Sequence, residues 1–109
     1  MDNEPKQGIQ LSDEQRALIE ALLARHLPGV KAWAFGSRVK GNARPWSDLD
    51  LVVFADPAQE KAVAELRDAF EESDLPFRVD LLVWDEIPND FRQQIRRNHK
   101  VLVKARKDG

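Results

Sequence analysis

One segment constrains the fold of this chain more than any other: a polar turn that opens with Gly36-Ser37 and, after ten intervening residues, closes with Asp48-Leu49-Asp50. A short apolar run lies on each side of the turn, and such runs are typical of buried β-strands. Because side chains alternate across a strand, Asp48 and Asp50 face the same way, roughly 6.6 Å apart. The fold must therefore bring two carboxylates to one face of a sheet, beside a glycine turn.

Three strands are predicted, over residues 30–35, 49–54 and 77–84. In the second and third strands one face is wholly apolar, and the third strand carries Asp80 on its other face. If both apolar faces meet the same layer of helices, Asp80 emerges on the same side of the sheet as the Asp48 and Asp50 carboxylates.

The helices follow from their start signals and apolar spacing. Ser12 and Gln15 form the pattern of a capping box, which begins a helix that ends near His26. Two further helices are predicted over residues 58–73 and 88–98, with Pro88 in the first turn of the last one. Residues 101–103 form a short extended segment.

The connections decide the topology. A helix joins the second and third strands, which favours a parallel pair with a right-handed crossover, whereas the compact turn favours an antiparallel first pair. We therefore expect an α/β fold: a small mixed β-sheet with helices packed mainly on one face and the acids near one edge of the open face.

Composition sets the outer limits. The 109 residues suit a single domain over 1–109, with flexible ends at 1–10 and 104–109. A net charge of −2 argues against direct nucleic-acid binding, and the lack of cysteine excludes thiolate catalysis. No apolar run approaches the ~20 residues of a membrane span, and no secretory signal is visible, so we expect a cytoplasmic protein without membrane contact.

The acidic cluster suggests metal-dependent nucleotidyl transfer. Neighbouring carboxylates are costly to bring together unless a cation neutralises them, and Mg²⁺ favours carboxylate and phosphate oxygens. Asp48 and Asp50 would hold two Mg²⁺ ions, and Asp80 would complete the metal site and take a proton from the attacking hydroxyl.

The glycine turn would hold the phosphates of the substrate. Gly36 lets the backbone approach a polyphosphate closely, and Ser37 offers a hydroxyl and a backbone N–H. Arg38 would add a charge-assisted hydrogen bond to the same phosphates.

The segments 34–38 and 47–53 resemble the DNA polymerase β-type nucleotidyltransferase superfamily, and the size of the chain resembles its minimal nucleotidyltransferase (MNT) branch. The resemblance covers residues 30–84. It implies the polymerase β-type fold, a requirement for Mg²⁺, and ATP as substrate with pyrophosphate leaving. It places the phosphate contact on Gly36 and Ser37 and the metal-binding acids on Asp48, Asp50 and Asp80.

Short members of this branch are often antitoxins of HEPN/MNT toxin–antitoxin pairs, which implies AMP transfer to a tyrosine hydroxyl of a helical HEPN-type toxin. Two alternatives stay open: an antitoxin that only binds and occludes its partner, and a subunit that modifies a small molecule with a helical partner. We also expect a partner because the chain has no spare segment to hold an acceptor.

Other residues are open to two interpretations. Lys40 and Arg44 are ordinary surface cations or phosphate contacts, and Trp46 is the aromatic residue of interest because it lies in the turn. The basic segment 92–107 is a solvated surface or a docking surface for acidic or phosphate groups.

Overall fold

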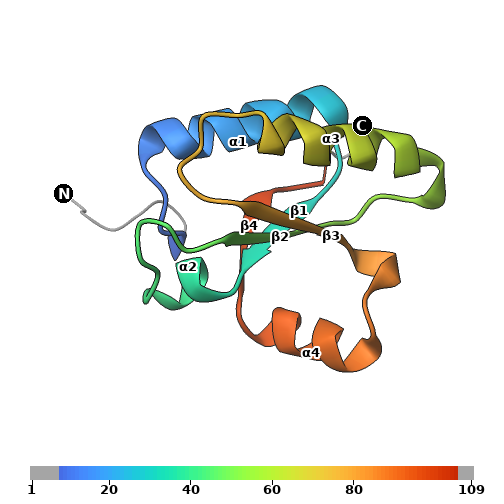
Figure 1. The fold of residues 1–109 in the computed structure, drawn as a ribbon. Coiled ribbons are helices and arrows are strands. Elements are labelled where there is room, and N and C mark those ends of the chain that lie inside the picture. Colours follow the sequence, from blue (N-terminus) through green and yellow to red (C-terminus); the bar gives the residue numbers. More distant parts are fainter. Residues whose placement is uncertain (1–7, 106–109) are drawn as a thin grey trace.

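The computed structural model describes residues 8–105 and arranges them as a four-stranded sheet between two layers of helices (Figure 1). In chain order the elements are α1 (Asp13–His26), β1 (Ala32–Phe35), α2 (Ser37–Lys40), β2 (Leu49–Val53), the 3-10 turn η2 (Pro57–Gln59), α3 (Glu60–Glu71), β3 (Val79–Val83), the 3-10 turn η3 (Trp84–Glu86), α4 (Asn89–Arg97) and β4 (His99–Val103). The mixed sheet with helices confirms the predicted fold class.

The strands run in the order β3-β2-β1-β4. The pair β1–β2 is antiparallel and the pair β2–β3 is parallel, as the connections predict. The segment expected as a short extended piece is a full strand, β4, which pairs antiparallel with β1. The third strand was predicted over residues 77–84, but residues 77–78 and 84 lie outside β3. The paired residues of β2 are only Leu49–Val53, which limits the length of β3.

One face of the sheet carries the larger core. Helices α1 and α3 pack there side by side, and Ile19, Leu51 and Leu66 are fully buried between helices and strands (Figure 1). These residues come from the apolar faces that the sequence pattern defines, so burial of apolar surface fixes which way the strands face.

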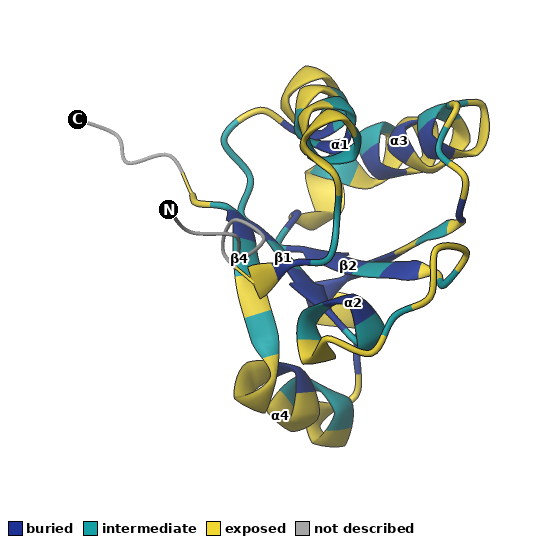
Figure 2. Cartoon of the chain, turned by 90° about the vertical axis from the view of Figure 1, so that its left-hand side faces the viewer, coloured by how far each residue is buried: buried dark blue, intermediate teal, exposed yellow. Residues whose placement is uncertain are grey.

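The opposite face of the sheet was predicted to be open, and this prediction is wrong. Helix α4 covers part of it through a second core in which Ile95 packs near Phe35, Val52 and Trp84. Figure 2 shows the buried strands enclosed between α1 and α3 on one side and α4 on the other. The acids therefore lie on a face that α4 closes in part.

The helix ends predicted from capping residues and prolines agree with the structure to within about two residues in most cases. The Ser12–Gln15 capping box is present at α1, with both reciprocal hydrogen bonds at 3.0 Å. Pro88 is the residue that caps α4 and does not belong to its first turn, and α3 begins at Glu60, since the turn η2 occupies the residues before it. Within residues 8–105 no helix is long and apolar enough to cross a bilayer.

The predicted flexible ends need one correction. Residues 1–7 and 106–109 lie outside the described part of the chain. Ile9, however, is buried in the main core, and the Gln10 N–H donates to the Arg38 carbonyl oxygen at 2.8 Å. The segment before α1 is therefore packed, because it supplies an apolar side chain and backbone hydrogen bonds to the fold.

Candidate active site

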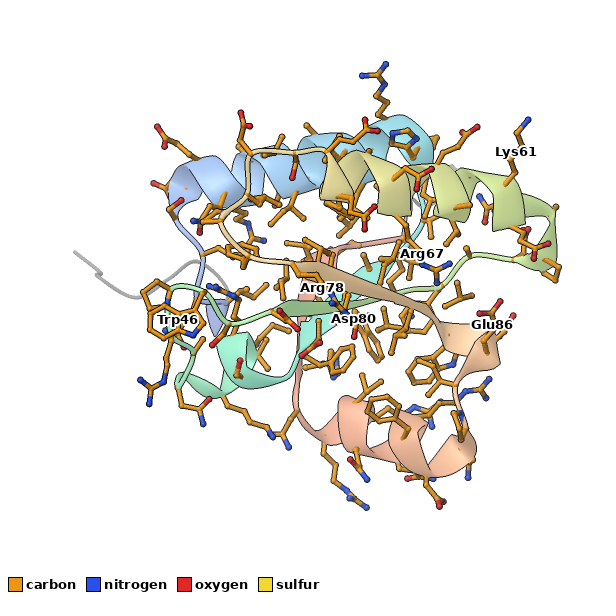
Figure 3. The ribbon with its side chains drawn as sticks, in the orientation of Figure 1. Trp46, Lys61, Arg67, Arg78, Asp80 and Glu86 are labelled. Carbon is orange, nitrogen blue, oxygen red and sulfur yellow. The ribbon has the colours of Figure 1, made fainter. Side chains whose placement is uncertain are left out.

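The sheet brings the predicted acids together by register. Asp50 is the second residue of β2 and pairs directly with Asp80 on the parallel strand β3, while Asp48 precedes β2 by one residue. Adjacent strands lie about 4.8 Å apart, so the Asp50 and Asp80 side chains are neighbours on one face. Asp48 and Asp80 are exposed and Asp50 is half-buried. Figure 3 labels Asp80 on β3.

The electrostatics of Asp50 reflect this crowding. Burial raises the pKa of the Asp50 carboxyl from 3.8 to about 6, and repulsion from Asp80 and then Asp48 adds to the shift. None of these carboxylates forms a hydrogen bond or an ion pair with any residue between 8 and 105. A cation at this position would remove the repulsion and restore the charged form of Asp50.

Gly36 lies directly against the Asp50 side chain. The residue lies between β1 and α2, and its φ of +82° is a backbone conformation that residues other than glycine rarely adopt. A Cβ placed on Gly36 would overlap the Oδ2 atom of Asp50. The glycine thus leaves space for the Asp50 carboxylate, a role that the sequence pattern does not predict. Ser37 follows as the first residue of α2.

Arg38 does not occupy the position predicted for a phosphate contact. Its side chain is only 5% exposed and lies over the Phe77 ring at 4.0 Å. The guanidinium donates five hydrogen bonds of 2.8–3.3 Å to backbone carbonyl oxygens of Gln10, Arg44, Pro45 and Ser47. Burial lowers the pKa of Arg38, while the nearby charge of Asp48 acts in the opposite direction. With the guanidinium occupied in this way, Arg38 supports the turn instead of reaching a ligand.

The turn between α2 and β2 is held from both sides. The Ser47 hydroxyl accepts from the Arg44 N–H at 2.8 Å, and the Ser47 N–H donates to the Arg44 carbonyl at 3.0 Å. From outside the turn, the Gln10 side-chain oxygen accepts from the Ala43 N–H at 3.0 Å. These contacts join the turn to the segment before α1 and fix the approach to Asp48.

A polar pocket of about 290 Å³ opens beside Gly36, between α2 and α4. Lys40 and Arg97 line it from the two helices, and Phe35 and Phe91 supply apolar walls. The two cations lie where an anion bound at Gly36 would need charge compensation. The position of Arg97 cannot be derived from the sequence pattern, because only the fold brings the end of α4 next to the glycine turn.

Other parts of the basic segment have structural contacts. The Arg92 and Arg96 guanidinium groups lie 5.3 and 5.1 Å from the Trp84 ring, and the Arg92 Nε donates to the Trp84 carbonyl. Arg106 and Lys107 lie outside the described residues.

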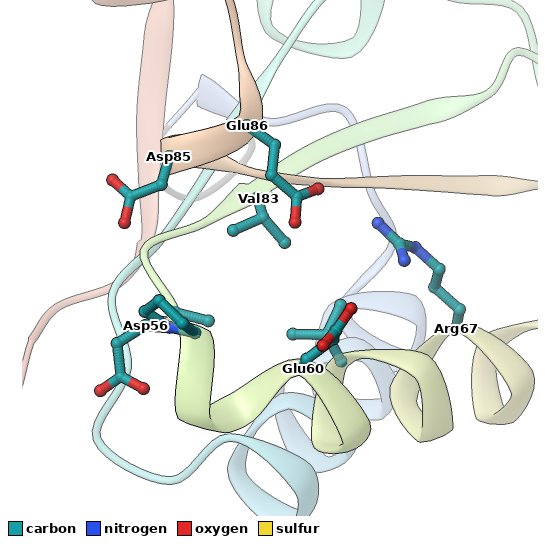
Figure 4. Close-up of a pocket in the computed structure, with 9 residues that line it drawn as sticks. Asp56, Glu60, Arg67, Val83, Asp85 and Glu86 are labelled. Carbon is teal, nitrogen blue, oxygen red and sulfur yellow. The ribbon is translucent and has the colours of Figure 1, made fainter.

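A second pocket, of about 390 Å³, lies at the other ends of β2 and β3 (Figure 4). Its wall is acidic, with Asp56, Glu60, Asp85 and Glu86 around Val83, and Arg67 is the one cation among its lining residues. The predicted acids are at the opposite ends of the same strands, so this pocket is separate from the candidate active site.

The carboxylates of this site suit a metal ion that the substrate and the protein hold together. Within residues 8–105 no three acidic, histidine or cysteine side chains converge on a common position that could hold a metal ion by themselves. Mg²⁺ usually takes one or two carboxylates, with phosphates and waters completing its shell. Asp48 and Asp50, two carboxylates separated by one residue, with Gly36 against Asp50, fit this requirement.

Comparisons with known proteins identify the family of the chain. The family model described as polymerase beta, nucleotidyltransferase matches residues 18–108. A Haemophilus influenzae protein designated a probable protein adenylyltransferase, MntA, is 42% identical over 100 residues, covering 91% of this chain and 88% of its own.

Solved structures show the same similarity. One assigned to the minimal nucleotidyltransferases is 33% identical, with a TM-score of 0.61 over 79% of this chain and 87% of its own. Another, a tri-AMPylated Shewanella oneidensis HEPN toxin in complex with its MNT antitoxin, is 22% identical and shares the fold, with a TM-score of 0.53 over 83% and 70% of the two chains. By its family match and by its close relative, this chain belongs to the polymerase beta family of nucleotidyltransferases.

Proposed function

We propose that the chain transfers AMP from ATP to a tyrosine hydroxyl of a helical, HEPN-type partner protein and thereby acts as an antitoxin. The observation that carries the proposal is the fit of Gly36 against Asp50, with Asp80 next to it in register. The adenylyltransferase designation of the 42% identical relative, and the AMPylated toxin bound to a chain of the same fold, support this choice of donor and acceptor.

Each residue of the proposed site has a role that follows from its position. Gly36 and Ser37 receive the phosphates of ATP, and Lys40 and Arg97 compensate their charge from the adjoining pocket. Asp48 and Asp50 would hold two Mg²⁺ ions together with the phosphates, with Asp80 completing the site; the metal would stabilise the charge on the attacking and leaving oxygens.

The reaction is a single displacement. The acceptor oxygen forms a bond to the α-phosphorus, the bond from that phosphorus to the bridging oxygen of the β-phosphate breaks, and pyrophosphate leaves. Asp80, exposed on the edge strand β3, takes the proton from the hydroxyl. Since ATP is the donor, we place the reaction in the cytoplasm.

The test uses purified chain, MgCl₂ and ATP labelled at the α-phosphate, with host lysate or the product of the neighbouring gene. We expect α-label, and no γ-label, on a protein whose mass identifies it. Asp48→Asn should abolish labelling, whereas Asp85→Asn, which removes an exposed acid at the distal pocket, should leave it unchanged.

The other outcomes distinguish the alternatives. Label on a soluble small product would indicate a subunit that modifies small molecules. A bound partner without any label, and protection by Asp48→Asn equal to that of the wild type, would indicate an antitoxin that acts by occlusion alone.

A further inference from the structure

We propose that Trp46 and the turn around it form the docking site for the acceptor polypeptide. The inference rests on the proposed function and extends it, because it names the surface that the protein acceptor contacts before its hydroxyl reaches Asp80.

The exposure of Trp46 is the first argument. Its side chain is 66% exposed, and it is the only large hydrophobic residue between 8 and 105 in this state. The other two tryptophans pack together, with Trp33 and Trp84 ring centroids 5.6 Å apart. Exposed tryptophans are costly in water and are enriched among the residues that dominate protein–protein binding.

The rigidity of the turn is the second argument. Trp46 lies between Pro45 and Ser47, and the carbonyl oxygens of both neighbours accept hydrogen bonds from the buried Arg38 guanidinium, at 3.0 Å and at 2.8–3.0 Å. The Trp46 backbone is thus held on both sides. A preorganised anchor loses little conformational entropy when a partner binds it, so it suits a recognition surface.

Position separates the acceptor from the nucleotide. The pocket that adjoins Gly36 opens toward α4, and Trp46 is not among its lining residues. Trp46 instead lies two residues before Asp48, at the outer end of the turn (Figure 3). A macromolecule that contacts Trp46 is thus bound close in the chain to the first of the acids, whereas the pocket beside Gly36 has no lining residue from the turn 41–47.

The chemistry of the surroundings indicates what the acceptor carries. Arg44 is exposed in the same turn, and an open hollow of about 360 Å³, lined by Leu11, Arg44 and Pro45 among others, lies beside it. We therefore infer an acceptor segment with an apolar or aromatic side chain for Trp46 and an acidic group for Arg44.

The test compares Trp46→Ala, Trp46→Phe and the exposed-surface control Lys61→Ala, using the protein that the wild type labels as acceptor. We expect Trp46→Ala to lower kcat/KM for that acceptor at least about tenfold, mainly through KM, because Trp46 does not touch the reacting atoms. Trp46→Phe should recover part of the loss. Affinity for AMP-PNP with MgCl₂ should stay within about twofold of wild type in all three variants, since uniform loss of acceptor binding leaves the nucleotide site intact.

Three results would overturn the inference while leaving the proposed function in place. These are an unchanged KM for the acceptor in Trp46→Ala, a matching loss of AMP-PNP affinity, which would assign Trp46 to the nucleotide, and a Trp46-dependent dimer in sedimentation, which would assign the surface to a second copy. If the wild type labels no protein at all, the proposed function fails first, and the inference falls with it.

Discussion

At the scale of single residues, the site depends on the close approach of Gly36 to Asp50. The turn puts a backbone without a Cβ against a carboxylate whose pKa is already raised by burial and by two acidic neighbours. Ionisation of Asp50 is therefore unfavourable in this arrangement, and a cation bound at the proposed site would offset that cost.

Gly36→Ala tests this contact, and Gly41→Ala is its matched control. Both glycines have positive φ, +82° and +85°, but a Cβ on Gly41 meets nothing within 4 Å. We expect Gly41→Ala, in the left-handed helical region, to lose about 1 kcal/mol from backbone strain, and Gly36→Ala, with ψ of −155°, to lose about 1–3 kcal/mol from strain. Gly36→Ala should lose more in urea unfolding and should also lose AMP transfer, whereas Gly41→Ala should keep it. Equal activity in the two variants would contradict the role given to the contact.

Asp50→Asn should stabilise the metal-free protein at neutral pH. The carboxyl has a pKa of about 6 in the folded state and 3.8 when unperturbed, so its stability contribution is fully present below pH 3.8 and is lost as pH rises through 6. Because the group is half-exposed, we expect a gain of only about 1–2 kcal/mol at pH 7.5.

Thermal unfolding with EDTA at pH 7.5 and pH 4.5 measures the effect. The gain should shrink at the lower pH, where the folded wild type also carries the proton, and the variant should be inactive at both. A variant less stable than wild type at pH 7.5 would contradict the direction of the pKa shift.

At the scale of elements, the turn between α2 and β2 is organised by one buried cation. Arg38 satisfies carbonyl oxygens from both the turn and the segment before α1, and its planar group stacks on Phe77 before β3. Lysine could not reproduce this fork of donors. The element that carries Trp46 and leads into Asp48 is thus defined by a residue of the preceding helix.

Arg38→Gln should release this turn. Removing the guanidinium leaves several carbonyl oxygens without their donor, and we expect a loss of about 2–4 kcal/mol in urea unfolding, with lower transfer activity. Chymotrypsin should cut after Trp46 faster than in wild type, as mass spectrometry can show, while Arg78→Gln, at an exposed position, should leave this cleavage unchanged. Resistance of the Trp46–Ser47 bond in Arg38→Gln would mean that other contacts suffice to hold the turn.

At the scale of the whole molecule, two cores on opposite faces of one sheet hold the site between them. The larger core orients β2 and β3, and the smaller core fixes α4, whose Arg97 reaches the pocket beside Gly36. A nucleotide bound at the proposed site would contact α2, α4 and the strands together, so it should stabilise the fold as a unit.

AMP-PNP with MgCl₂ should therefore raise the Tm of the wild type in a concentration-dependent way, by an amount that corresponds to about 2.7 kcal/mol at one hundred times Kd. Asp50→Asn should show little of this shift, and Arg97→Ala a reduced shift, because each removes one part of the binding site. The exposed-surface variant Lys61→Ala should respond as the wild type does. A full shift in Asp50→Asn would separate nucleotide binding from the acidic cluster.

The features of this protein that are predicted correctly from its sequence are those that local interactions control. The capping box of α1, the apolar faces of β2 and β3, the parallel and antiparallel pairings and the shared face of Asp50 and Asp80 all follow from spacing, alternation and connection length. These features depend on residues near one another in the chain or on a simple period, so they can be derived without coordinates.

The side chains that meet across long stretches of chain are evident only from the three-dimensional fold. It buried Arg38 among carbonyl oxygens up to 28 residues away, placed α4 over the face expected to be open, brought Arg97 to Gly36 and packed Ile9 into the core. A cation in a turn has the same sequence signature whether it is exposed or buried. Its place is set by the burial and hydrogen bonding of the whole fold, since a buried guanidinium is stable only where the backbone supplies enough acceptors.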